Sequence, residues 1–129
     1  MFFDTNVLIS AFMTSGVSRD VFERCLLAHE IYISEFVLRE LRDVMMRLNF
    51  DRDDVDEIEK FLRGNCIVVV HGGLNERVCR DESDDNILAG ALEGKVDVIV
   101  TGDKDLLEIG KYKGILIVSP GDIWRVEGF

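Results

Sequence analysis

Short apolar runs alternate with segments of helical periodicity along the whole of this chain. The runs stand at residues 1–3, 31–33, 66–70, 96–100 and 115–118. Between them, apolar residues recur at three- and four-residue steps, most clearly over residues 21–26, 37–48, 53–63 and 87–92. Strands that alternate with helices form a parallel sheet covered on both faces. We therefore expect an α/β fold, a single α/β/α sandwich around a central parallel sheet.

Several residues are placed to begin the expected helices. Ser18, Ser34 and Ser83 each precede a periodic segment and are candidate N-caps. Asp105 is a candidate cap for the short turn at residues 106–107. Ser119 followed by Pro120 predicts a last short helix through residue 124, because proline suits the first helical position.

The size and composition favour one compact domain over residues 1–129. The chain is 47% hydrophobic and contains one proline, which argues against disorder. Its longest apolar run falls well short of the roughly 20 residues that cross a bilayer, and no basic leader precedes the first run. We expect a soluble cytoplasmic protein without a membrane partner.

Carboxylates follow or flank the predicted strands. Asp4 comes directly after the first run, and Asp103 and Asp105 come after the fourth. Because the carboxyl ends of parallel strands meet at one edge of a sheet, these acids are predicted to face one crevice. Two helical segments supply further acids for the same edge, namely Glu40, Asp84 and Asp85.

The ligand chemistry of these acids indicates a hard divalent cation. They are oxygen donors without a histidine or thiolate beside them, which suits Mg²⁺ or Mn²⁺ better than zinc. The two histidines and three cysteines are too scattered to form a zinc site. Each acid also has an ordinary structural explanation: Asp84 and Asp85 suit a helix N-terminus, and Glu40 stands close to two arginines with which it can pair.

A cation held by carboxylates favours phosphoryl transfer through an activated water. No Ser-His or Cys-His arrangement suggests a covalent nucleophile. The net charge of −10 counts against tight binding of nucleic acid. Several cations lie near these acids in the sequence and have two alternative interpretations. They form either a local basic rim that contacts RNA or a set of solvated side chains. They are Arg39, Arg42, Arg47, Arg77, Arg80 and Lys104.

Four segments together resemble the PIN-domain family, and in particular its prokaryotic branch of VapC-like toxins. They are residues 3–11, 34–41, 80–91 and 100–107. The resemblance covers nearly the whole chain. It implies Mg²⁺- or Mn²⁺-dependent cleavage of single-stranded RNA, usually by a homodimer, with a cognate antitoxin protein that blocks the site.

The resemblance also implies roles for individual residues. It makes Asp4, Glu40, Asp84 and Asp103 the catalytic and metal-binding acids. Asp85, a rival of Asp84, and Asp105 are further metal candidates. Thr5, Asn6 and Thr101 match polar positions that support the ligands, and Thr101 is expected to donate its hydroxyl to a carboxylate. The chain starts only three residues before Asp4, so its first strand is shorter than in relatives.

Three other interpretations stay open at this point. One is a stand-alone PIN nuclease that processes RNA, and another is a non-catalytic PIN-like module that binds RNA or protein. The third is a phosphoaspartyl protein, either a receiver or a phosphatase. The phosphatase is disfavoured because its pattern needs a second acid where this chain has Asn6, and a receiver needs its acceptor acid on a middle strand.

Overall fold

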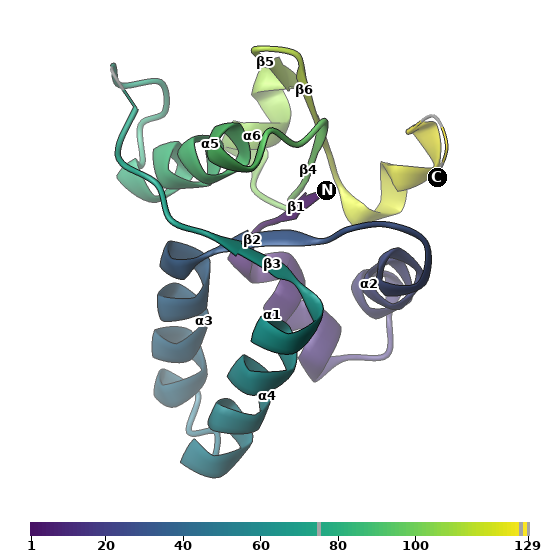
Figure 1. The fold of residues 1–129 in the computed structure, drawn as a ribbon, viewed down its shortest axis with the longest axis vertical. Coiled ribbons are helices and arrows are strands. Elements are labelled where there is room, and N and C mark those ends of the chain that lie inside the picture. Colours follow the sequence, from purple (N-terminus) through teal and green to yellow (C-terminus); the bar gives the residue numbers. More distant parts are fainter. Residues whose placement is uncertain (75, 127, 129) are drawn as a thin grey trace.

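The computed structural model describes residues 1–74, 76–126 and 128, which form a six-stranded sheet flanked by helices (Figure 1). The strands are β1 (Phe2–Phe3), β2 (Tyr32–Ser34), β3 (Ile67–Val69), β4 (Val98–Val100), β5 (Lys111–Tyr112) and β6 (Ile115–Val118). The helices are α1 (Thr5–Met13), α2 (Val17–Ala28), α3 (Glu35–Arg47), α4 (Arg52–Asn65), α5 (Glu82–Gly94), α6 (Lys104–Ile109) and the 3₁₀ helix η1 (Pro120–Arg125).

The sheet has the order β3-β2-β1-β4-β6-β5 and is parallel except for β5, which pairs antiparallel with β6. The predicted α/β fold is confirmed, with this one edge strand as an addition. The sequence does not predict β5, because this strand is only two residues long. It returns to β6 through Lys113 and Gly114, both with positive φ, and so forms a tight hairpin that lacks an apolar run of its own.

The chain changes direction across the sheet at β1. Strands β2 and β3 extend from one side of β1, whereas β4 and β6 lie on the other side. In open α/β sheets a ligand crevice opens at such a switch point, outside the carboxyl ends of the strands. Here the two strands at the switch are followed directly by Asp4 and Thr101.

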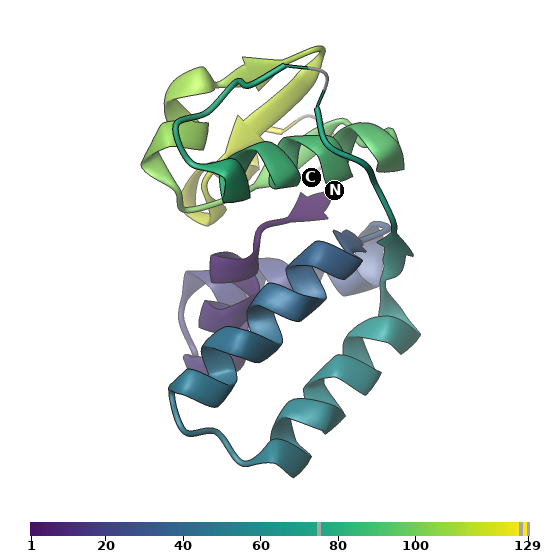
Figure 2. The same cartoon turned by 90° about the vertical axis from the view of Figure 1, so that its left-hand side faces the viewer.

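Helices cover both faces of the sheet, as Figures 1 and 2 show: α1, α3 and α4 lie on one side of β1 to β3, and α5 lies on the other. The core between these layers contains the fully buried side chains Phe2, Phe3, Leu8, Ile33, Leu38 and Ile99. Both residues of β1 are buried, as expected for a central strand with helices on its two faces.

The helix starts agree only partly with the sequence. Ser34 caps α3 as predicted, since its hydroxyl oxygen accepts a hydrogen bond from the Val37 amide at 3.1 Å. Ser119 is likewise the N-cap residue of η1, with Pro120 at its first position, as predicted. Three other predicted caps are wrong: α2 follows Gly16 rather than Ser18, α5 is capped by Asp81 rather than Ser83, and α6 by Asp103 rather than Asp105. In both α5 and α6 the observed cap is an aspartate that stands two residues before the predicted cap. Its carboxylate accepts a hydrogen bond from the backbone amide of the predicted cap.

The first helix was not predicted at all. α1 begins at Thr5, immediately after a two-residue strand, so the apolar residues 7–9 continue as a helix. A continuous apolar run does not distinguish a buried strand from a buried helix. Asp4 is the N-cap of this helix. Among the described residues, no helix is long and apolar enough to cross a membrane.

Close packing of α5 on β1 leads to a prediction about Gly90. A Cβ at this position would lie 2.8 Å and 2.9 Å from two ring carbons of Phe2, which is itself fully buried. Gly90→Ala is therefore expected to lower the free energy of unfolding by about 1–3 kcal/mol through overpacking, as measured by urea denaturation.

Gly64→Ala in α4 is the matched control. No atom lies within 4 Å of its Cβ position, so the better helix propensity of alanine should leave stability unchanged or slightly raised. Equal stability of the two variants would contradict the packing described for Gly90.

Candidate functional site

Asp4 is fixed at the junction of β1, α1 and β4. Its backbone amide donates to the Val100 carbonyl at 3.0 Å. Its carboxylate accepts from the Thr5 amide and from the Thr101 hydroxyl, each at 2.6 Å. The predicted hydrogen bond from Thr101 to a carboxylate is thus present. Both Asp4 oxygens are held, and the side chain is only 5% exposed.

Burial raises the pKa of Asp4 to about 6. The hydrogen bonds from Thr101 and Thr5 act in the opposite direction, because they stabilise the ionised form. The nearby charges of Glu40 and Asp103 raise the pKa further. A carboxyl group of this kind ionises with difficulty unless positive charge is brought to it.

Glu40 is tied to the same junction through Thr5. The Thr5 hydroxyl donates to Oε1 of Glu40 at 2.5 Å, while the Thr5 amide donates to Asp4. Thr5 therefore fixes two candidate ligands at once. The alternative that Glu40 pairs with a flanking arginine is wrong for Arg42, whose guanidinium pairs with Asp56 and Glu59 of α4 instead.

Asp84 and Asp103 approach from α5 and α6. Asp103 caps α6 by accepting from the amides of Asp105 and Leu106 through Oδ1, which leaves Oδ2 available. Asp84 as a whole residue is 6% exposed, and among the described residues its carboxylate has no hydrogen-bond or ion-pair partner. Burial raises the pKa of Asp84 to about 6, and the charges of Asp103, Asp81, Asp4 and Asp105 add to the effect.

Asp85 differs sharply from its neighbour. Its carboxylate accepts from the Cys79 amide at 2.7 Å and from the Val78 amide at 3.3 Å, and it pairs with Arg77 at 3.4 Å. These contacts use Asp85 to hold the loop that precedes α5. Asp105 is also engaged, since the Arg80 guanidinium lies 2.9 Å from one of its oxygens.

A cavity of about 190 Å³ brings together four of the six candidate acids, namely Asp4, Glu40, Asp84 and Asp103. Asn6, another residue singled out in the sequence, also lines it. Asp84, Asp103 and Asp105 can each place one oxygen so that the three lie within 4.8 Å of one another. The Asp84 carboxylate, which has no partner among the described residues, fits a hard divalent cation together with these oxygens.

Two contributors to this site were missed or undervalued in the sequence. Asp81 lines the cavity and caps α5 by accepting from the Ser83 amide at 2.9 Å. Its position three residues before Asp84 was an available signal for a helix start. Arg77 was expected only as part of a basic rim, yet it braces the loop by donating to the carbonyls of Cys79 and Arg80.

Comparison with known proteins gives consistent results. A family model described as "PIN domain" matches residues 1–105. The uncharacterized protein MJ1680 of Methanocaldococcus jannaschii is 30% identical over 112 residues, covering 82% of this chain and 72% of that protein. The fold is similar to a chain in the crystal structure of VapBC2 from Rickettsia felis bound to a DNA fragment from their promoter. The TM-score is 0.66, at 12% identity, over 92% of this chain and 96% of that one.

The raised pKa of Asp84 generates a prediction for the metal-free protein. Ionising Asp84 costs the folded state free energy that the unfolded state does not lose, so the penalty appears as pH rises from about 4 and is complete above about 6. Asp84→Asn removes the charge and keeps the volume. It is expected to raise the free energy of unfolding by about 1–2 kcal/mol at pH 8, but to change it little at pH 4, as measured by urea denaturation in EDTA.

Asp97→Asn is the control, because it makes the same chemical change at an exposed position. Its stability should follow that of the wild type at both pH values. A destabilised Asp84→Asn at pH 8 would contradict the repulsive environment assigned to Asp84.

Proposed function

Because the chain belongs to the PIN-domain family, we propose that it is a metal-dependent endoribonuclease that hydrolyses phosphodiester bonds of single-stranded RNA. Members of this family are typically metal-dependent nucleases. The observation that carries the proposal is the Asp84 carboxylate, which has no partner among the described residues and lines one cavity with Asp4, Glu40 and Asp103. We take residues 1–129 to act as one domain.

Asp84 and Asp103 would hold Mg²⁺ or Mn²⁺ with their available oxygens, Asp4 and Glu40 would complete the acidic set, and Asp105 would assist from beside the cavity. Bound there, the cation supplies Lewis-acid chemistry that activates water and neutralises charge on the phosphate. Thr101 and Thr5 keep the Asp4 and Glu40 carboxylates in fixed orientations. Asn6 adds an amide to the lining of the cavity.

The contacts favour Asp84 over Asp85 as the third ligand. The Asp85 carboxylate is already satisfied by two amides and Arg77, whereas Asp84 has no such partner among the described residues. Asp85 is therefore proposed as a structural residue of the loop that leads into α5, rather than as a ligand.

The biological setting extends the proposal. The resemblance to VapC-like proteins supports a toxin of a type II toxin–antitoxin pair, with a cognate antitoxin protein as partner. A cytoplasmic homodimer is the corresponding expectation. The similarity to a chain of the VapBC2 structure supports this proposal through the fold alone.

The central prediction concerns RNA cleavage. The purified protein is expected to cut a fluorescent single-stranded RNA panel with Mn²⁺ or Mg²⁺ and not with EDTA. Asp4→Asn, prepared identically, should lose at least about 100-fold in rate, by analogy with the loss of one preorganised electrostatic group at an active site. Circular dichroism should show that the variant is folded.

Equal cutting by the two proteins would identify a contaminating nuclease. Binding of RNA without any cutting by the wild type, even after long incubation, would replace the proposal with a non-catalytic module. The Asp97→Asn variant serves as the matched control, because it makes the same chemical change at an exposed position.

A thermal-shift experiment separates the two neighbouring aspartates. A cation that binds only the native state at 100 times its Kd adds about 2.7 kcal/mol to stability, so Mn²⁺ should raise the Tm of the wild type. Asp84→Asn should lose most of this rise. Asp85→Asn should start from a lower Tm, since it disrupts hydrogen bonds worth about 1–3 kcal/mol, yet it should keep the rise. The opposite pattern would make Asp85 the ligand.

A further inference from the structure

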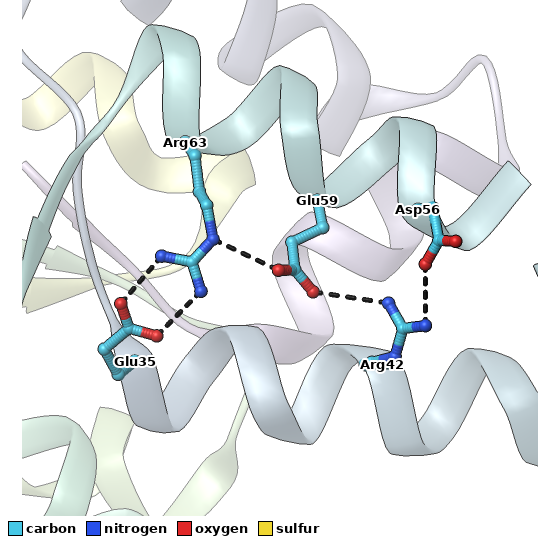
Figure 3. A network of polar contacts seen from close by, with 5 residues as sticks. All are labelled: Glu35, Arg42, Asp56, Glu59 and Arg63. Carbon is cyan, nitrogen blue, oxygen red and sulfur yellow. Dashed lines mark hydrogen bonds and ion pairs between the residues drawn. The ribbon is translucent and has the colours of Figure 1, made fainter. Parts of the chain in front are cut away.

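The three arginines of α3 are in different environments. Arg42 faces α4, where its guanidinium lies 2.6 Å from Asp56 and 3.4 Å from Glu59 (Figure 3). Glu59 also pairs with Arg63, which in turn pairs with Glu35 at 2.7 Å. This five-residue network joins α3 to α4. Because Asp56 and Glu59 both engage the guanidinium of Arg42, this arginine is not available to bind a ligand.

Arg39 and Arg47 have no ion pair within the described part of the chain, and both are exposed. Arg47 makes a single weak contact, from its Nε to the Asp43 carbonyl at 3.5 Å. These two arginines stand on either side of Glu40 in the sequence of α3. Their separation of eight residues corresponds to about 12 Å along the helix.

Each of these arginines lines a cavity that is bounded by α3 and α5. Arg47 lines the cavity that contains the acids, between Glu40 of α3 and Asp84 of α5. Arg39 lines a second cavity, also of about 190 Å³, with Phe36 of α3, Asn86 of α5 and His71. We call these two cavities together the α3–α5 groove. In Figure 2, the green helix α5 lies above β1 and the blue helix α3 lies below it.

We propose that a single strand of RNA lies along the α3–α5 groove, with backbone phosphates on either side of the scissile bond contacting Arg47 and Arg39. The inference rests on the proposed function and adds the path of the substrate across the site. A guanidinium without a protein carboxylate partner is suited to phosphate, with which it forms charge-assisted and often bidentate hydrogen bonds.

The charge distribution supports a narrow track rather than a broad surface. The chain carries a net charge of −10, so nonspecific attraction of polyphosphate to the whole protein is opposed. Only cations that lie beside the acids can offset this locally. Each of the two cavities, at about 190 Å³, has room for part of a single nucleotide.

The test measures binding separately from cleavage. The Asp4→Asn background in EDTA prevents cutting, and a fluorescein-labelled 12-nucleotide oligouridine is the probe in fluorescence anisotropy at several salt concentrations. Arg39→Gln together with Arg47→Gln is expected to weaken binding about tenfold at low salt. It should also reduce the slope of log K against log salt by about 1.4, because two phosphate contacts are lost at about 0.7 each.

Arg125→Gln is the control for removing an arginine away from the α3–α5 groove. Arg125 is the last residue of η1 and lies against the ring of Trp124. In Figure 1 the yellow η1 helix lies across the molecule from α3, so the variant should bind as the background does. Arg42→Gln should lower the Tm through the network of Figure 3 and keep the same binding below that Tm.

Each contrary result overturns the inference in a recognisable way. If the Arg39 and Arg47 variant binds as tightly as Arg125→Gln while the wild type cuts RNA with Mn²⁺, the track is wrong and the ribonuclease proposal stands. If a 12-base-pair RNA duplex binds as tightly as the single strand with the same sensitivity, the single-strand assignment is wrong. If the wild type neither cuts nor binds the probe, both the proposed path of the RNA and the proposed function are wrong.

Discussion

The carboxylate of Asp4 is held between two strands that are distant in sequence, and the geometry of the site depends on this contact. The hydrogen bond from the Thr101 hydroxyl joins the ends of β1 and β4 across 97 residues of sequence. The same hydroxyl oxygen accepts from the Asp103 amide at 3.0 Å. The parallel register of β1 and β4 therefore determines where Asp4 and Asp103 lie relative to each other.

Such an arrangement costs stability in the absence of a cation. Raising the pKa of the buried Asp4 from 3.8 to about 6 corresponds to about 3 kcal/mol against its ionised form at neutral pH. The fold offsets part of this cost with local dipoles. Asp4, Asp81 and Asp103 are the N-caps of α1, α5 and α6, where helix dipoles favour negative charge. Two of the four acids proposed as ligands, Asp4 and Asp103, are thus N-caps as well.

The sequence predicted the sheet and the main acids because both leave local patterns. Runs of three to five mainly apolar residues indicated the strands, and the acids at their ends indicated Asp4 and Asp103. What it did not reveal depends on contacts between distant segments. Asp84 and Asp85 have the same position in a helix N-terminus, and only the fold shows that amides of Val78 and Cys79 engage one of them. The predicted caps of α5 and α6 are wrong because two good N-cap residues stand two positions apart at each helix start, namely Asp81 and Ser83, and Asp103 and Asp105.

The different environments of the three α3 arginines also depend on contacts between segments that are distant in sequence. In the sequence, Arg39, Arg42 and Arg47 are one basic cluster around Glu40. Packing of α4 against α3 separates them, because Asp56 and Glu59 of α4 pair with Arg42 and with neither Arg39 nor Arg47. Exposed ion pairs of this kind contribute little stability individually, but they decide which guanidinium groups remain for another ligand. Within α3, the two arginines left without a carboxylate partner are the two that line the α3–α5 groove.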